Sequence, residues 1–122
     1  MSLAQRLVTA GISAVQAQAI QGTVAPGLTA TGTTQANALP LGADCCNFTT
    51  VPAGSGCILP PMNPGDDITI FNGGANALLV YPPVGGQIKA LGVNAGYSVA
   101  VATPLCFVQC ITPTLYVASQ AA

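Results

Sequence analysis

The side chains that could act as acids, bases or metal ligands are few and scattered along the chain. The sequence has no histidine, the residue that most often supplies a proton-transfer group near neutral pH. Asp66 and Asp67 are adjacent, so along a strand they diverge instead of converging as a catalytic pair. Asp66 follows Pro64-Gly65, which is typical of a residue that caps a turn. The chain has only five charged residues: Arg6, Asp44, Asp66, Asp67 and Lys89.

The other reactive side chains are five cysteines: Cys45, Cys46, Cys57, Cys106 and Cys110. A cysteine nucleophile needs a base, and zinc sites use Cys-x-x-Cys pairs or histidines, which this sequence lacks. We therefore expect reduced thiols that act as small core hydrophobes, with a disulfide or a metal site as the alternative. On extended segments Cys45 and Cys46 point to opposite faces, whereas Cys106 and Cys110 share one face.

Other kinds of site are also disfavoured. A serine triad lacks its histidine, and no Ser-x-x-Lys motif ends at Lys89. Calcium could be held weakly by Asn63, Asp66 and Asp67, but a capped turn fits these residues better. The tyrosines fall inside strand patterns, which favours packing over sugar binding. We predict a protein that is not an enzyme and has no catalytic residue, cofactor or metal.

The scarcity of charged residues limits the kinds of partner that the chain can bind. Only 4% of the residues are charged, against about 25% in ordinary soluble domains. Binding to nucleic acid or to an anionic membrane needs clustered basic residues, and the chain has two. A surface without charges repels neighbours weakly, so we expect much of it to be covered by other chains. The alternative is a monomer whose hydroxyl and amide groups are solvated.

One long uncharged stretch, residues 97–120, has the length of a membrane span. Pro104 and Pro113 interrupt it, and polar residues are scattered through it, so short strands explain it better than one helix. The beginning of the sequence lacks the continuous apolar segment of a signal peptide. We expect neither secretion nor a membrane-spanning segment.

Residues 1–22 are predicted to form an N-terminal helical arm. Ser2 and Ser13 each begin a capping-box pattern, and Gly11 and Gly22 follow as helix-ending glycines, which predicts helices over about 2–10 and 13–21. Such short helices must dock on something, either their own β-domain or a neighbour. The apolar residues expected to make these contacts are Leu3, Leu7, Ile12, Val15 and Ile20.

The rest of the chain is predicted to be β-structure. Residues 23–43 form a linker or a first strand near 28–34, and residues 44–122 form the β-domain, with Ile68 and Ile70 on one face of a strand. Glycine-rich turn residues between 67–72 and 77–81 predict a hairpin, and a final hairpin is expected around Thr112-Pro113. We predict a mainly β fold, a β-sandwich, jelly-roll-like domain or barrel, preceded by the two helices.

Leu78–Tyr81 is apolar on both faces, whereas a strand that is wet on one side should alternate. Both faces should therefore be covered, one by the core and the other by a second layer or another subunit. Leu79 and Tyr81 are accordingly predicted assembly contacts.

The block from Pro64 to Pro83 (PGDDITIFNGGANALLVYPP) resembles a family of small virion-associated proteins of tailed bacteriophages. Leu28–Ala36 (LTATGTTQA) and Asn94–Ser98 (NAGYS) are similar to the same family, so the resemblance covers most of residues 28–119. It implies a trimeric β-domain on the virion, as a capsid decoration (cement) protein or a head fibre. The family has no active-site motif to carry over, and the cysteines depart from its pattern.

We therefore expect a virion structural protein on the capsid surface, made in the host cytoplasm. A cement subunit would bind between major capsid subunits as a homotrimer, since closed cyclic symmetry is the usual form of oligomers. The alternative is a head or tail fibre or adhesin subunit that binds a host receptor.

Overall fold

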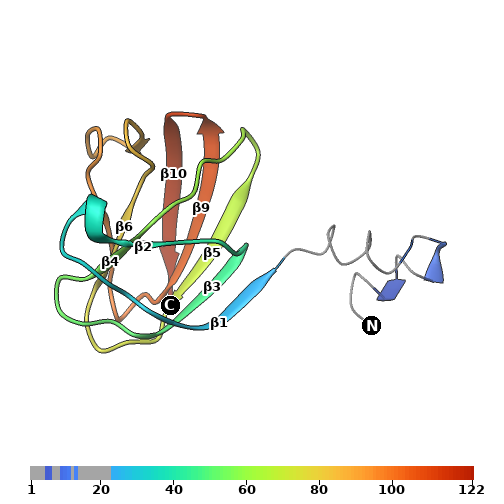
Figure 1. Ribbon diagram of the computed structural model, residues 1–122, viewed down its shortest axis with the longest axis horizontal. Helices are drawn as coiled ribbons and strands as arrows, with labels where there is room; N and C mark the ends of the chain where they lie inside the picture. The colour runs from blue at the N-terminus through green and yellow to red at the C-terminus, as the bar shows by residue number, and fades with distance from the viewer. Residues whose placement is uncertain (1–4, 7–8, 12, 14–22) are drawn as a thin grey trace.

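The computed structural model describes residues 5–6, 9–11, 13 and 23–122, and residues 23–122 form two facing β-sheets (Figure 1). The elements in chain order are β1 (Val24–Thr29), the 3-10 helix η1 (Gln35–Asn37), β2 (Leu39–Pro40), β3 (Cys45–Thr50), β4 (Gly56–Ile58), β5 (Asp67–Asn72), β6 (Leu78–Tyr81), β7 (Gln87–Ile88), β8 (Tyr97–Val99), β9 (Leu105–Thr112) and β10 (Leu115–Ala121). The prediction of a mainly β fold is confirmed.

The larger sheet, sheet A, has six strands in the order β1-β3-β5-β9-β10-β7, and sheet B has four in the order β2-β4-β6-β8. Both sheets are mixed. In sheet A, β1, β3 and β5 run parallel while β9 is antiparallel to β5 and β10. In sheet B, β2, β4 and β6 run parallel while β8 is antiparallel to β6. Neither sheet closes on itself, so the predicted alternative of a barrel is wrong.

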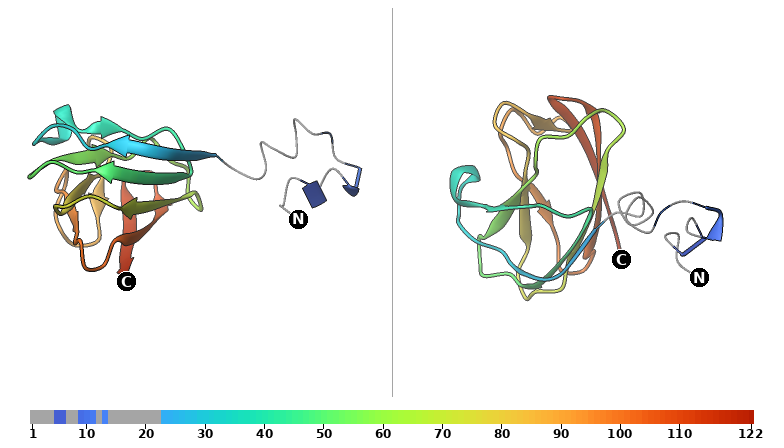
Figure 2. Two further views of the ribbon diagram at one scale, coloured as in Figure 1. Left: turned by 90° about the horizontal axis from the view of Figure 1, so that it is seen from below. Right: turned by 45° about the vertical axis from the view of Figure 1, so that its right-hand side comes forward.

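The chain winds as a coil that visits the two sheets in turn. Odd-numbered strands from β1 to β7 lie in sheet A and even-numbered strands from β2 to β8 lie in sheet B (Figure 2). One circuit separates Val24 from its parallel partner Cys45, and the next separates Cys45 from Thr69. Parallel neighbours need such crossover connections, because a tight turn can join only antiparallel strands.

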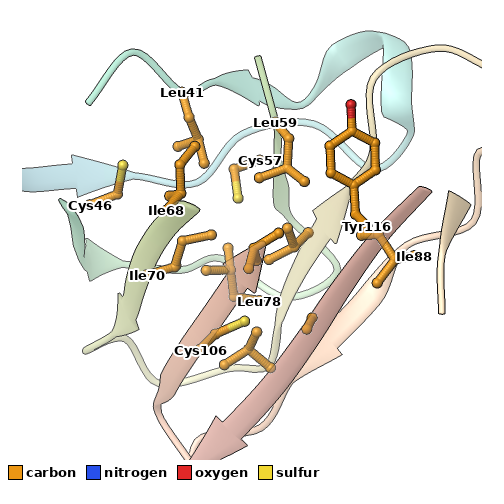
Figure 3. Packing of buried hydrophobic residues seen from close by; sticks show 14 of the residues in the cluster. Leu41, Cys46, Cys57, Leu59, Ile68, Ile70, Leu78, Ile88, Cys106 and Tyr116 are labelled. Carbon is orange, nitrogen blue, oxygen red and sulfur yellow. The ribbon is translucent and has the colours of Figure 1, made fainter. Parts of the chain in front are cut away.

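The hairpin predicted between 67–72 and 77–81 is wrong. β5 pairs with β3 and β9, whereas β6 pairs with β4 and β8, so the glycine-rich turn is an arch between the two sheets. Ile70 and Leu78 both need the core, and the arch lets them enter it from opposite sides (Figure 3). At the turn a Cβ on Gly74 would lie 2.6 Å from Cβ of Val51, so only glycine fits there.

The final hairpin is confirmed. β9 and β10 pair antiparallel around Thr112-Pro113, with Val108 opposite Ala118 and Phe107 opposite Ser119. Alternate residues of β9 point into the core and outward, so Cys106, Val108 and Cys110 are buried. Ile68 and Ile70 share the buried face of β5, as predicted.

The core fills the space between the sheets (Figure 3). Sheet A contributes β-branched, aromatic and thiol side chains, and sheet B contributes the thiol of Cys57 from β4 and aliphatic side chains from β6 and β8. The largest side chains that are almost completely buried include Phe48, Ile70, Leu78, Val80, Ile88, Val99, Val108 and Tyr116. Val101 lies beyond the end of β8 and is exposed.

The first strand lies at Val24–Thr29 instead of near 28–34. Among the described residues before Thr23, Gln5, Arg6 and Thr9 have helical conformation, and the Ala10 N–H donates to the carbonyl of Arg6 (3.0 Å). Ser13 is the one described residue of the second predicted helix and is not helical, so the two predicted helices are not confirmed. The predicted contact residues of the arm lie outside the described residues: Leu3, Leu7, Ile12, Val15 and Ile20.

Candidate functional site

The cysteines, all within residues 23–122, are free thiols and form no disulfide. Four of them are buried, and Cys45 is half-buried on the outer face of β3, opposite in direction to Cys46. The Sγ of Cys46 donates to the carbonyl of Ala43 (3.4 Å), and that of Cys110 donates to the carbonyl of Thr112 (3.0 Å). Burial raises the pKa of Cys57 strongly and that of Cys106 to about 11, which keeps both thiols protonated and unreactive.

Two of the three aspartates have structural partners. Asp44 Oδ2 accepts from the backbone N–H (2.9 Å) and hydroxyl (3.2 Å) of Thr23, which fixes the start of β1. Asp66 Oδ2 accepts from the N–H of Asn63 (3.0 Å), which confirms the predicted turn cap. Asp44, Asp66 and Asp67 line a surface depression beside Met62. Among the described residues, however, no three Asp, Glu, His or Cys side chains are grouped to hold a metal ion.

Lys89 and Tyr116 also pack within the chain. Lys89 adopts a positive φ of 52°, and its Nζ lies 5.3 Å from the ring centroid of Tyr97. Tyr116 is fully buried, and its hydroxyl donates to the carbonyl of Pro113 (3.0 Å).

The predicted assembly contacts Leu79 and Tyr81 lie half-buried on the outer side of β6. Tyr81 is covered in part by its own chain, since its hydroxyl donates to the carbonyl of Thr33 (3.4 Å). A Cβ on Gly56 would lie 3.0 Å from the Tyr81 ring, so the glycine lets the strand and the ring pack closely. Part of the cover expected over this second face therefore comes from the segment before η1.

A different surface is left uncovered: the outer side of β5, β9 and β10, which lie side by side in sheet A (Figure 1). Five large apolar residues on this side are exposed: Phe71 (41%), Phe107 (46%), Ile111 (45%), Leu115 (36%) and Val117 (38%). We call these five residues, with the half-buried Leu105, the apolar face. In the sheet register Phe71 pairs with Leu105, whereas Val117 pairs with the polar Gln109.

A hollow of about 280 Å³ opens on the same side of sheet A. Phe107 pairs with Thr69 on one side and Ser119 on the other, and these smaller side chains leave a depression beside the ring. Asp67 contributes the one charge among the described residues that line the hollow. The surface therefore combines projecting aromatic rings with a recess.

The edges of the sheets are poorly suited to pairing with another chain. The edge strand β1 contains Pro26, which has no N–H to donate, and its register with β3 is irregular. On sheet B the edge strands are only Leu39–Pro40 (β2) and Tyr97–Val99 (β8), and on the far side of sheet A the edge strand β7 is only Gln87–Ile88.

A pattern in the sequence could have predicted the apolar face. Leu105–Ile111 has apolar residues at both alternate sets of positions, the criterion that singled out Leu78–Tyr81. Applied to β9, the same criterion would have identified Phe107 and Ile111 as residues in need of a cover.

No protein-family model, curated protein or solved structure matches the chain. In the described part of the chain, no helix is long and apolar enough to cross a membrane.

Proposed function

We propose that this protein is a structural subunit of a bacteriophage virion, a capsid decoration (cement) protein that stabilises the shell by binding between major capsid subunits. It acts on the capsid surface as a homotrimer after synthesis in the host cytoplasm. It is not an enzyme and needs no cofactor, nucleic acid or membrane. The observation that carries the proposal is a two-sheet domain with few charges and an uncovered apolar face.

The energetics of burial support this role. Apolar surface removed from water contributes about 25 cal/mol per Å², and a standard interface buries about 800 Å² on each partner. The described charged side chains are few, so little charge has to be desolvated when the domain is packed between neighbours: Arg6, Asp44, Asp66, Asp67 and Lys89. A subunit held by several such contacts resists expansion of the shell by the pressure of packaged DNA.

The test is binding of the purified protein to expanded capsids of the phage that encodes it, prepared without the protein. We expect saturable co-sedimentation with the capsids and a higher temperature of capsid disruption when the protein is bound. The same protein unfolded by heat before mixing is the control. Protein that sediments as a monomer at all concentrations and does not bind the capsids would overturn the proposal.

Localisation on the virion separates the cement from the alternative fibre or adhesin. Immunolabelling over the whole head supports the cement. Labelling confined to the tail or to projecting fibres supports the alternative and contradicts the cement.

A further inference from the structure

We propose that copies of this chain pack against one another through the apolar face, with Phe71 of one copy entering the hollow beside Phe107 of the next. The inference rests on the proposed function, because it names the partner at one surface of the assembling subunit. It leaves the remaining surfaces to contact the major capsid protein.

Phe71 has the geometry of an inserting side chain. Phe71 is 41% exposed and precedes Asn72, the last residue of β5, at the arch to sheet B. Gly73 lies against the ring, since a Cβ there would be 3.3 Å from the Cε1 atom of Phe71. The neighbouring backbone therefore supports the ring on one side, while the other side is open to a partner.

The hollow has the size and lining for such a ring. An apolar cavity of about 150 Å³ holds benzene, and this hollow measures about 280 Å³. Phe107 and Val117 provide its apolar walls, and the backbone of Val108 and Ala118 lies beneath. A ring that enters it exchanges water for aromatic and aliphatic contacts.

The position of the two parts indicates the kinds of assembly. Phe71 pairs with Leu105 at one end of the β5–β9 ladder, whereas the hollow is centred on residues nearer the other end, such as Asp67 and Gln109. A projection and a recess at different places on one face allow a head-to-tail contact, which closes into a ring when the rotation allows, and equally a two-fold contact in which Phe71 of each copy enters the hollow of the other. A closed trimer would use this contact once in each pair of neighbours.

Charge favours a second copy as the occupant. β5, β9 and β10 contain no lysine or arginine, and Asp67 is their one carboxylate. A strongly charged partner would bury charges that find no counterpart here, which costs free energy. A second copy brings the same uncharged surface and a net charge of only -1, so repulsion between copies is weak.

The test measures the mass of the full-length protein in solution, without capsids, by sedimentation velocity over a range of concentrations. We expect the wild type to form a closed oligomer. Phe71→Gln removes the inserting ring and Ser119→Lys places a charge in the hollow, and each should weaken association by about tenfold or more. Both positions are exposed, so the fold should be retained, as checked by circular dichroism.

Val84→Gln is the matched control, because Val84 is 81% exposed and lies outside the apolar face. It should associate like the wild type. A wild type that is monomeric throughout, or variants that associate as strongly as it does, would contradict the inference.

Capsid binding separates the two proposals. A monomeric wild type that still binds capsids contradicts the packing of copies but leaves the cement function standing. If Phe71→Gln abolishes capsid binding and leaves self-association unchanged, the apolar face binds the capsid protein and the inference is wrong.

Discussion

Asn72 of β5 connects the two sheets, because its Nδ2 donates to the carbonyl of Val99 in β8 (3.1 Å). The same amide nitrogen donates to the carbonyl of Asn76 (2.9 Å), and its Oδ1 accepts from the N–H of Gly74 (3.1 Å). Only 2% of Asn72 is exposed, so these bonds are screened little by water. One side chain thus holds the arch and fixes sheet A to sheet B.

We predict that Asn72→Leu lowers the free energy of unfolding by about 2–4 kcal/mol, because it leaves buried backbone groups without their partner. Urea denaturation measures this loss. Asn47→Leu is the control, since Asn47 makes one exposed bond to the carbonyl of Pro26 (2.8 Å). Its cost should stay below about 1 kcal/mol. Equal losses for the two variants would contradict the role of Asn72.

Gly74→Ala should destabilise the fold by about 1–3 kcal/mol, because the added methyl group overlaps the side chain and backbone N of Val51. Gly42→Ala is matched to it, since nothing lies within 4 Å of the added atom. That variant should be neutral or slightly more stable. Thermal unfolding of the two proteins provides the comparison, and a Gly74→Ala protein as stable as Gly42→Ala would show that the arch has room.

Stability should fall as the pH rises from about 9 to 11. Burial raises the pKa of Cys106 from 9.0 to about 11, so in this range the unfolded thiol loses its proton while the folded thiol keeps it. The protonated Cys106 thiol thereby contributes on the order of 2–3 kcal/mol to the free energy of unfolding. This contribution is complete below pH 9.0 and is lost as the pH rises through 11. Urea denaturation at several pH values measures the slope of the free energy of unfolding against pH.

Cys106→Ala should reduce this slope, whereas Val108→Ala should lower stability at every pH and leave the slope intact. Val108 is the matched control because it is a buried neighbour on β9 that does not titrate. If both variants keep the wild-type slope, the buried Cys106 thiol is not the source of the alkaline sensitivity.

Only one thiol per chain should react rapidly with Ellman's reagent in the folded protein. Cys45 is the half-buried cysteine, and the other four are buried. All five should react after denaturation, since none is in a disulfide. A Cys45→Ala variant should lose the rapid phase. Rapid reaction of two or more thiols in the folded wild type would show that the core opens easily.

Sequence patterns identified many of the strands but not their partners. The alternation of Ile68 and Ile70 and the Thr112-Pro113 turn are local signals, and the structure confirms both. The turn at Gly73-Gly74 has the composition of a hairpin, yet it joins different sheets. The choice depends on where the core lies, because Ile70 and Leu78 must meet across it, and no local pattern contains that information.

The candidate site was predicted only in outline. Scarce charge indicated a covered surface, and Leu79 and Tyr81 were assigned to it because both alternate positions of their strand are apolar. The structure places a segment of the same chain over part of Tyr81, which a strand pattern cannot reveal. Phe71 was missed because it is the one large apolar residue on its side of β5, beside Asp67 and Thr69.

The coiled path of the chain has a consequence for how the protein is made. Among the ten strands of residues 23–122, β9 and β10 are the one pair of consecutive strands that bond to each other. Every other pairing must close a loop through the opposite sheet, and non-local pairing of this kind is slow. We expect β9 and β10 to be protected first in pulsed hydrogen exchange during refolding. Because β9 (Leu105–Thr112) and β10 (Leu115–Ala121) follow the other eight strands in the chain, sheet A cannot be completed during synthesis until this hairpin has left the ribosome.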